Sequence, residues 1–430
     1  MRIGLVSYEY PPQPGLGGVG TYVYRLASAL GQAGHEVVVL AGPASGDEIP
    51  LHNVTVHRIA ARYEPSLGFS LFRWIYWRVL SKMMEKAHPI VWHWMRWNLA
   101  SADALLEIHR KTPLDVIEAP EHAANGLFAG RLRRWPMVVR IHGPWDLFFG
   151  INRTEGTAMN RMLTSLERKS TRYAQIVTTP SRTMSAFIRK KWNMMRPPVV
   201  VPNFMDVPEI PAPLPGPDEP QRIVVAGRIE RFKGQDVLVK AFARIAARHP
   251  RAELHVIGPD QWSAKESFAS VVDQIVTDPD ARRRVILTGP VTLTQVQEEL
   301  RGATCAVVCS SGFESFSFST LEAMAAARPI VGSRVGAIPE LLDNGRCGLL
   351  AAPGNVAQFA DSLDQLLSNP DLRHQLATNA HDRARRRYDT QVHPPNGPSL
   401  QTRPRNLLRR RRPPQNQPHP LHPPTCLKLF

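Results

Sequence analysis

The chain has 430 residues and a formal net charge of +16. Its 43% hydrophobic and 21% charged residues are ordinary globular values, so collagen, a coiled-coil rod and wholesale disorder are excluded. At roughly 100–200 residues per domain, the length predicts two or three domains. The four cysteines are too few and too scattered for a disulfide framework or a zinc site, so we expect a reducing, cytoplasmic compartment.

The first residues, MRIGLVSYEYPP, carry too short an apolar run for a signal peptide and predict a first strand. No stretch approaches the roughly 18–20 continuous apolar residues of a membrane-spanning helix. Short apolar, β-branched runs follow, and runs that end at Gly, Pro or Ser are typical of strands buried on both faces of a parallel sheet. In the first half they lie at 2–8, 36–42, 54–60, 114–120, 137–143, 175–181 and 198–203. An amphipathic helix is predicted at 21–34, ending at Gly34.

A proline-rich break at 211–221, a predicted hinge, separates these strands from a second series. The second series lies at 222–228, 253–259, 284–290, 305–311, 329–335 and 347–353. Two series of alternating strands and helices predict an α/β protein with two doubly wound, Rossmann-like domains at 1–205 and 206–390. Because such sheets bind ligands at the carboxyl ends of their strands, we expect the two domains to face a cleft.

Residues 391–430 hold seven Arg and Lys and no acidic residue, which leaves +9 (16 minus 7) for residues 1–390. Ten of the 39 prolines also lie in these forty residues. Such a composition cannot pack a core and predicts a disordered tail. The arginine run favours non-specific polyanion binding, but it lacks the interleaved aromatic residues of a specific nucleic-acid site.

A glycine-rich turn, PPQPGLGGVGTYVYRLA at 11–27, joins the first predicted strand to the first helix. Gly17 and Gly18 would let the backbone approach a ligand closely. The pattern is no clean dinucleotide fingerprint, and no acidic residue ends the second strand, so NAD binding is not expected. A GxxxxGK[ST] phosphate loop is also missing from the sequence.

His142 ends the predicted strand 137–143 in the segment VVRIHGPWD. At the ligand side of a sheet it is a candidate hydrogen-bonding group for a sugar or acceptor, or a candidate base. The alternative is a capped or core histidine.

Arg228 and Lys233 lie in the segment GRIERFKG, directly after the first strand of the second series. Two cations at the carboxyl end of a strand could neutralise a diphosphate. The alternative is a solvated pair on the surface.

The segment 310–331, SSGFESFSFSTLEAMAAARPIV, holds Glu314 in a loop and Glu322 in the helix that follows. A Ser- and Gly-containing loop that opens a helix offers free backbone N–H groups for a phosphate. A carboxylate on each side could hold hydroxyls on the two arms of a nucleotide-sugar. The alternative is a surface helix with two solvated glutamates.

In this order and spacing the motifs resemble those of glycosyltransferase family 4, retaining nucleotide-sugar enzymes with the two-domain GT-B fold. The resemblance runs from Met1 to about Tyr388 and includes the turn PNFMD at 202–206. It implies an acceptor-side domain at 1–205 and a nucleotide-sugar-binding domain at 206–390. The implied partners are a nucleoside-diphosphate-sugar donor and a glycan or lipid-linked acceptor, as in polysaccharide biosynthesis.

Carried over to this chain, the resemblance implies that Arg228 and Lys233 hold the donor diphosphate and that Glu322 binds the ribose hydroxyls. It implies that Glu314 contacts the transferred sugar and that His142 lines the reaction centre.

Further donor-binding residues follow from the same resemblance. Gly17 and Gly18 would allow close approach to the diphosphate or sugar, and the backbone around Ile286 and Leu287 would meet the base. The loop and helix start contribute Ser317, Phe318, Ser319 and Thr320.

The implied mechanism is same-face attack by the acceptor hydroxyl, with the leaving diphosphate able to take the proton. The protein then mainly positions the substrates and stabilises the leaving group. No metal and no cofactor are expected. The only Asp-x-Asp pattern, Asp278 to Asp280, contains a proline and predicts a turn or a helix cap.

The chain departs from the family pattern at Ser317 and Ala327, where the family usually has glycine; Ser317 could constrict the phosphate cradle. The C-terminus also departs, because the family normally ends with a helix that returns to the first domain. Here DRARRRYDT at 382–390 leads into prolines and arginines. A shifted reading frame and a genuine disordered tail both remain open, and transfer activity could be impaired in either case.

Residues 69–97 hold five of the nine tryptophans, interleaved with five Arg and Lys. This mixture suits contact with an anionic membrane at its inner face. The alternative is a helix and loop whose tryptophans form core or an acceptor-side lid.

Two rival functions remain from the sequence. Sugar-nucleotide epimerases share the fold, although the paired glutamates favour transfer. The chain could also be a catalytically impaired nucleotide-sugar binder.

Overall fold

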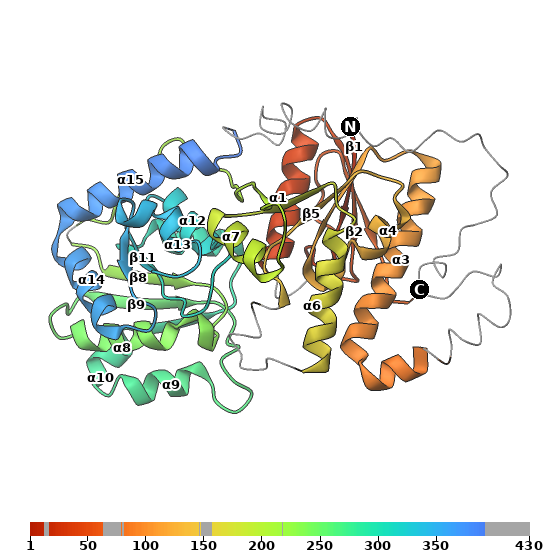
Figure 1. Ribbon diagram of the computed structural model, residues 1–430. Helices are drawn as coiled ribbons and strands as arrows, with labels where there is room; N and C mark the ends of the chain where they lie inside the picture. The colour runs from red at the N-terminus through yellow and green to blue at the C-terminus, as the bar shows by residue number, and fades with distance from the viewer. Residues whose placement is uncertain are drawn as a thin grey trace, which may run out of the picture. The chain divides into compact units, whose positions relative to one another are not determined.

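The computed structural model describes residues 1–12, 17–62, 79, 81–145, 147, 157–216 and 218–391. These form two compact units, one from 1–180 and 188–201, the other from 181–187 and 202 onward. Each unit is built on one parallel sheet with flanking helices (Figure 1). The predicted tail lies outside the described residues.

The first unit contains a seven-stranded sheet in the order β3-β2-β1-β4-β5-β6-β7. Its strands are β1 (Arg2–Val6), β2 (Glu36–Ala41), β3 (Val54–Arg58), β4 (Val116–Pro120), β5 (Met137–Arg140), β6 (Ile176–Thr179) and β7 (Val199–Val200). The strand order reverses direction between β1 and β4, which pair from Ile3 with Val116 onward. A doubly wound sheet offers its ligand crevice at the carboxyl ends of such a pair. Gly17 follows β1 and Glu121 follows β4, so both lie at this edge.

The helices of the first unit are α1 (Gly18–Gln32), α3 (Pro89–Lys111), α4 (Leu127–Leu132) and α6 (Ala158–Thr171), with the 3₁₀ turn η1 (His122–Ala124). Helix α7 (Arg182–Lys191) is divided, because residues 181–187 belong to the second unit and residues 188–191 to the first. The predicted helix end is confirmed, because Gly34 has a φ of +83° just beyond α1. Trp92 and Trp97 of α3 are buried, each in a separate core cluster, and the partly buried Trp94 packs against the cluster that contains Trp92. For these three tryptophans the core interpretation is therefore confirmed; residues 69–78 lie outside the described residues.

The second unit contains a six-stranded sheet in the order β10-β9-β8-β11-β12-β13. Its strands are β8 (Gln221–Ala226), β9 (Ala252–Ile257), β10 (Val285–Gly289), β11 (Cys305–Val308), β12 (Ile330–Ser333) and β13 (Leu349–Ala351). Here the order reverses between β8 and β11, so the loops after these two strands meet at one edge. Each apolar run predicted from the sequence overlaps one of the strands β1–β13.

The helices of the second unit are α8 (Gln235–Ile245), α9 (Phe268–Ile275), α10 (Pro279–Arg283), α11 (Leu293–Arg301), α12 (Phe318–Ala325), α13 (Ile338–Leu341), α14 (Val356–Ser368) and α15 (Pro370–Tyr388), with 3₁₀ turns η2 (Arg231–Lys233) and η3 (Asp343–Gly345). The cap predicted at Asp278 is confirmed, because its carboxylate accepts the N–H groups of Asp280 and Ala281 at the start of α10. In the part of the chain with described structure, no helix has the length and apolarity to span a bilayer.

The proline-rich segment is attached to the second unit through one buried arginine. Arg328 is fully buried, and its guanidinium donates to the carbonyl oxygens of Ala212 and Pro213. Before this segment, Met205 N–H donates to the Tyr388 carbonyl at 3.0 Å. Burial lowers the pKa of Arg328 to about 10. The chain crosses between the units at 180/181, 187/188 and 201/202, all of them before the proline-rich segment that was predicted to be the hinge.

Candidate functional site

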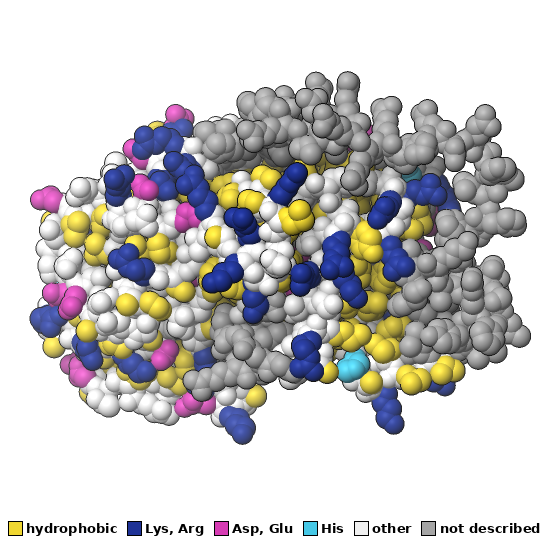
Figure 2. Space-filling view, viewed as in Figure 1, with side chains coloured by type: hydrophobic (Ala, Val, Ile, Leu, Met, Phe, Trp, Pro, Cys, Tyr) yellow, Lys and Arg dark blue, Asp and Glu magenta, His cyan; other side chains and the backbone are white. Residues whose placement is uncertain are grey.

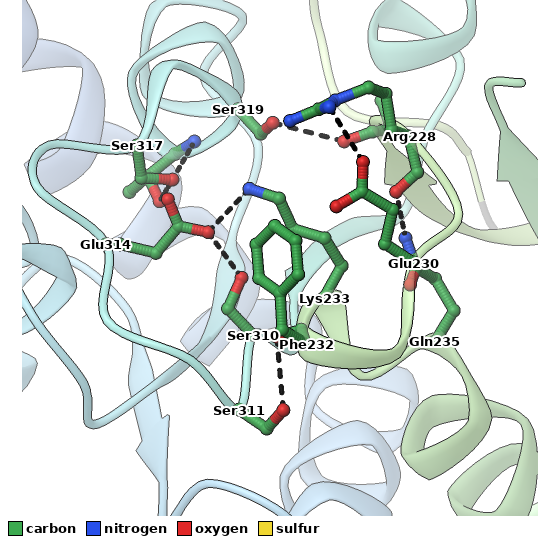
Figure 3. Close-up of polar contacts among 12 residues, drawn as sticks. Arg228, Glu230, Phe232, Lys233, Gln235, Ser310, Ser311, Glu314, Ser317 and Ser319 are labelled. Carbon is green, nitrogen blue, oxygen red and sulfur yellow. Dashed lines mark hydrogen bonds and ion pairs between the residues drawn. The ribbon is translucent and has the colours of Figure 1, made fainter. Parts of the chain in front are cut away.

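At the start of the loop after β8, the backbone at Gly227 lies unusually close to the backbone at Gly258, directly after β9. Gly227 has a φ of +142°, and a Cβ added to Gly258 would lie 2.1 Å from the Gly227 carbonyl oxygen. Glycine at 258 therefore lets the ends of β8 and β9 meet. Arg228 follows, and its guanidinium pairs with Glu230 at 2.8 Å (Figure 3). Gln235 Nε2 donates to the Arg228 carbonyl at 2.9 Å and holds the loop in shape.

The loops after β8 and β11 are joined by backbone contacts. Phe232 presents its carbonyl oxygen to the N–H groups of Ser311 at 2.8 Å and Gly312 at 3.0 Å. Gly234, with a φ of +74°, leaves no space for a side chain, since a Cβ would lie 2.1 Å from the Cys309 carbonyl oxygen. This close packing brings the cation of the first loop beside the carboxylate of the second.

Lys233 and Glu314 form an ion pair at the centre of this edge. Lys233 Nζ lies 2.6 Å from Glu314 Oε1, and Ser310 Oγ donates to the same oxygen at 2.6 Å (Figure 3). The side chains are 27% and 12% exposed, so the ammonium still reaches solvent. A partly exposed ammonium in a loop of this kind can bind an anionic group of a ligand.

The position of Glu314 is fixed by its backbone. Ala337 N–H donates to the Glu314 carbonyl at 2.8 Å. A Cβ on Gly336, where φ is +54°, would lie 2.1 Å from that same carbonyl oxygen. The loop that carries Glu314 therefore rests directly on the start of α13.

Helix α12 starts at this edge with a capped N-terminus. Ser317 Oγ accepts the N–H of Thr320 at 3.3 Å, and Ser319 Oγ donates to the Ala226 carbonyl at the end of β8 at 3.1 Å. The helix N-terminus faces the same edge as Lys233, and its dipole favours an anion there. Glu322 lies one turn further along α12 and is half-buried.

The two departures from the family pattern occupy left-handed backbone. Ser317 has a φ of +85° and Ala327 a φ of +52°. Only glycine adopts these angles without strain, which explains why glycine is usual at both places. Ser317 partly offsets its strain by capping α12.

The structure separates Ile286 and Leu287 from this cluster. Both lie within β10, the edge strand, with β9 between it and β8. Leu287 packs against the core, whereas Ile286 is 36% exposed. Thr320 is fully buried, and Phe318 packs edge-on against Phe316.

In the first unit, His142 follows β5 and is held by a buried carboxylate. Glu121 accepts the backbone N–H of His142 at 2.8 Å and that of Gly143 at 2.6 Å. Glu121 is fully buried, and burial raises its pKa to about 7. Glu121 was not predicted from the sequence, where its place directly after β4 is the available signal.

The His142 ring is 8% exposed and packs edge-on against Tyr22 at 4.8 Å. Burial, then Arg140 and His122, hold the pKa of His142 well below its ordinary value, so the imidazole is neutral at pH 7. A neutral imidazole serves as a hydrogen-bonding group. In the predicted glycine-rich turn, a Cβ on Gly17 would lie 3.0 Å from the Glu9 carboxylate, so a side chain at position 17 would have little room.

Apart from Ile286 and Leu287, the residues predicted from the sequence thus fall into two groups, one in each unit. Arg228, Lys233, Glu314 and the start of α12 assemble at one edge of the second sheet, while Gly17, Gly18 and His142 belong to the first unit. Ser310 joins the first group and was missed, because a serine in a serine-rich loop carries no distinguishing signal. Within the described residues, no cluster of three or more His, Cys, Asp or Glu is arranged to hold a metal ion.

Comparison with protein families gives two matches that together span most of the chain. Residues 17–203 match the family described as glycosyl transferase 4-like domain, and residues 220–369 match glycosyl transferases group 1. The junction between the two matches lies close to the boundary between the two units.

Similar curated proteins cover nearly the full length. The chain is 28% identical to a glycogen synthase of Mycobacterium tuberculosis, over 91% of this chain and 92% of that protein. It is 27% identical to a D-inositol 3-phosphate glycosyltransferase of Pseudarthrobacter chlorophenolicus, over 86% and 88% of the two chains.

Solved structures share the fold. The sucrose-phosphate synthase of Thermosynechococcus elongatus aligns with a TM-score of 0.72 at 20% identity, covering 95% of this chain and 99% of that one. HepE of Anabaena, solved with UDP, aligns with a TM-score of 0.66 at 18% identity, covering 94% and 100%. With two domain matches in this order on one GT-B fold, the chain is a glycosyltransferase and belongs to glycosyltransferase family 4.

Proposed function

We propose that the protein transfers a sugar, with retention of configuration and without a metal, from a nucleoside-diphosphate sugar to a glycan or lipid-linked acceptor. The proposal goes beyond membership of the family, since it specifies the donor, the stereochemistry and the class of acceptor. Its main support is the cluster of Lys233, Glu314 and Ser310 at the N-terminus of α12.

The donor diphosphate is proposed to bind where positive charge gathers. Lys233, Arg228 and the positive end of α12 are all on the loops after β8 and β11. A diphosphate would replace the carboxylates that now pair with the two cations. Since these cations can neutralise the leaving group, metal independence is part of the proposal.

Glu314 and Glu322 are proposed to divide the recognition of the donor. Glu322 lies in the helix and would bind the ribose, while Glu314 in the loop would contact the transferred sugar. No further cofactor is proposed. HepE of Anabaena has been solved with UDP-glucose, and a similar class of donor is proposed for this chain.

The site of action is proposed to be the cytoplasm. The buried cysteines Cys305, Cys309 and Cys347 are free, as expected for a reducing compartment. A lipid-linked acceptor would be met at the inner face of the membrane.

Isothermal calorimetry with UDP, GDP and ADP, in buffer containing a chelator, tests the donor site. We expect one of the three to bind to the full-length protein and Lys233→Met to weaken that binding. If none binds, or if binding needs a divalent cation, the donor or the metal independence is wrong.

Transfer is tested with the nucleotide-sugar of the base so identified. Donor consumption that depends on an added acceptor, with the anomeric configuration retained by NMR, supports transfer. Donor converted to a second sugar nucleotide without acceptor would indicate an epimerase.

A further inference from the structure

Most of the net positive charge of residues 1–390 is concentrated in residues 157–201. Residues 1–390 have a net charge of +9, and residues 157–201 alone contain nine Arg and Lys and one Glu, a net charge of +8. The single acidic residue, Glu167, is fully buried. The remaining residues are therefore close to neutral, so this concentration is not a general property of the protein.

Eight of these basic side chains lie in the first unit, and all eight are exposed: Arg161, Arg168, Lys169, Arg172, Arg189, Lys190, Lys191 and Arg196. Arg161 has a polar or ring partner, whereas the other seven form no ion pair within the described part of the chain. Charges that are left uncompensated in this way favour binding to an anionic surface. We call these eight residues, with Met195 and Val199, the basic surface.

The sheet topology places the two parts of the basic surface on one side of the unit. Helix α6 connects β5 to β6, and α7 connects β6 to β7, its neighbour on the other side. Two successive right-handed crossovers in the same direction put their helices on the same face of the sheet. Figure 2 shows Lys and Arg side chains gathered over α6 and α7.

Apolar side chains protrude among the cations. Met195 lies in the turn between α7 and β7 and is 96% exposed, and Val199 is 55% exposed. Lys190, Lys191 and Arg196 surround them in the sequence. An exposed apolar tip flanked in the sequence by exposed cations suits the interface of an anionic bilayer, where the cations bind headgroups and the apolar groups enter the acyl region.

We propose that the basic surface docks the protein on an anionic phospholipid membrane, with Met195 inserted at its tip. A nucleic acid or an acidic polysaccharide would use the cations but would gain nothing from an exposed methionine. The proposal also relocates the membrane contact expected at 69–97, because Trp92 and Trp97 are buried in the core and Trp94 is partly buried against it.

Flotation of the full-length protein with vesicles of equimolar phosphatidylglycerol and phosphatidylcholine tests the proposal. Each basic side chain near an anionic surface contributes about five-fold to partitioning, so the triple variant Lys190→Ala, Lys191→Ala, Arg196→Ala should lose about a hundred-fold. The triple variant Lys265→Ala, Arg283→Ala, Arg301→Ala, which changes exposed residues of the second unit, is the matched control. We expect it to bind like the unchanged protein.

Insertion is tested by Met195→Asp, with Ile210→Asp as control because Ile210 is 84% exposed in the second unit. Met195→Asp should weaken partitioning about ten-fold and Ile210→Asp should not. Equal binding by Met195→Asp and the unchanged protein would overturn the lipid assignment and favour an anionic polymer.

Two other results would overturn the docking surface itself. One is equal loss in both triple variants. The other is complete loss when Arg409, Arg410, Arg411 and Arg412 of the tail are replaced by Gln. Nucleotide binding by calorimetry should be unchanged in the variants of the basic surface, so failure of this proposal is separable from failure of the proposed donor site.

Discussion

Replacing Glu314 with Gln should tighten the binding of a plain nucleoside diphosphate. Lys233 Nζ now lies 2.6 Å from Glu314 Oε1, so a diphosphate must compete with that carboxylate for the ammonium. The amide of Gln keeps the shape and can still accept a hydrogen bond from Ser310, but it carries no charge. Lys233 would then be free to bind the diphosphate.

The size of the effect follows from the burial of the pair. Two unit charges about 4 Å apart interact with about 4 kcal/mol at an effective dielectric constant of 20. Lys233 is 27% exposed, so solvent and salt reduce this, and pairs near a surface retain about 1 kcal/mol or less. We therefore expect a gain in affinity of up to about five-fold for Glu314→Gln. Lys233→Met should instead lose about ten- to hundred-fold, since hydrogen bonds to charged groups contribute about 1.5–3 kcal/mol.

Calorimetry on the two single variants and the double variant measures this coupling, with thermal melting to confirm that each is folded. Glu107→Gln is the matched control, because Glu107 also pairs with a lysine, Lys111, but on an exposed helix of the first unit. It should leave nucleotide affinity unchanged. Transfer by Glu314→Gln should fall even though nucleotide binding improves, because the proposed contact with the sugar is lost.

One result would refute this reasoning. If Glu314→Gln weakens nucleoside-diphosphate binding as much as Lys233→Met does, Glu314 holds the ammonium in its binding position and does not compete with the ligand.

Three further predictions concern stability and recognition. Ser317→Gly and Ala327→Gly should each raise the free energy of unfolding by about 1 kcal/mol, because left-handed backbone costs non-glycine residues about 1–2 kcal/mol; unraised denaturation midpoints would contradict this. Glu322→Ala should weaken nucleoside-diphosphate and nucleotide-sugar binding equally, since both contain the ribose; calorimetry showing loss for the sugar nucleotide alone would count against it. Burial raises the pKa of Glu121 from 4.5 to about 7, so its contribution to stability is full below pH 4.5 and is lost as pH rises through 7. The lowered pKa of His142 changes stability with pH in the opposite direction, so the effect of Glu121 has to be isolated. Denaturation of the unchanged protein is therefore compared with that of Glu121→Gln between pH 4.5 and 7. Identical dependence of stability on pH in the two proteins would refute the raised pKa of Glu121.

The sequence alone was sufficient to predict the strands and their division into two series. A strand buried on both faces is recorded locally, as a short apolar run with a turn residue at its end. Runs such as 36–42 and 305–311 carry that signal without help from distant residues, and they became β2 and β11. The same local logic identified the cap at Asp278 and the helix end at Gly34.

The sequence also identified Lys233 and Glu314 as candidates, but not their pairing across 81 positions. That contact depends on β8 and β11 being neighbours in the sheet, which local periodicity does not encode. Nor did the sequence reveal Glu121, whose role depends on being buried beneath the backbone of His142.

The tertiary structure also decided the backbone angle at Ser317, the role of the tryptophans of α3 and the position of the basic residues, because each depends on how distant segments pack. The glycine preference at position 317 was evident as a family pattern, but only the fold shows that φ is +85° there, because the chain must turn from the loop into α12. The tryptophans of α3 looked equally suited to a membrane and to a core, and packing assigned three of them to the core. The net charge could be counted from the sequence. Its concentration on one face could not, because it depends on the strand order and on the right-handed crossovers that put α6 and α7 on the same side of the sheet.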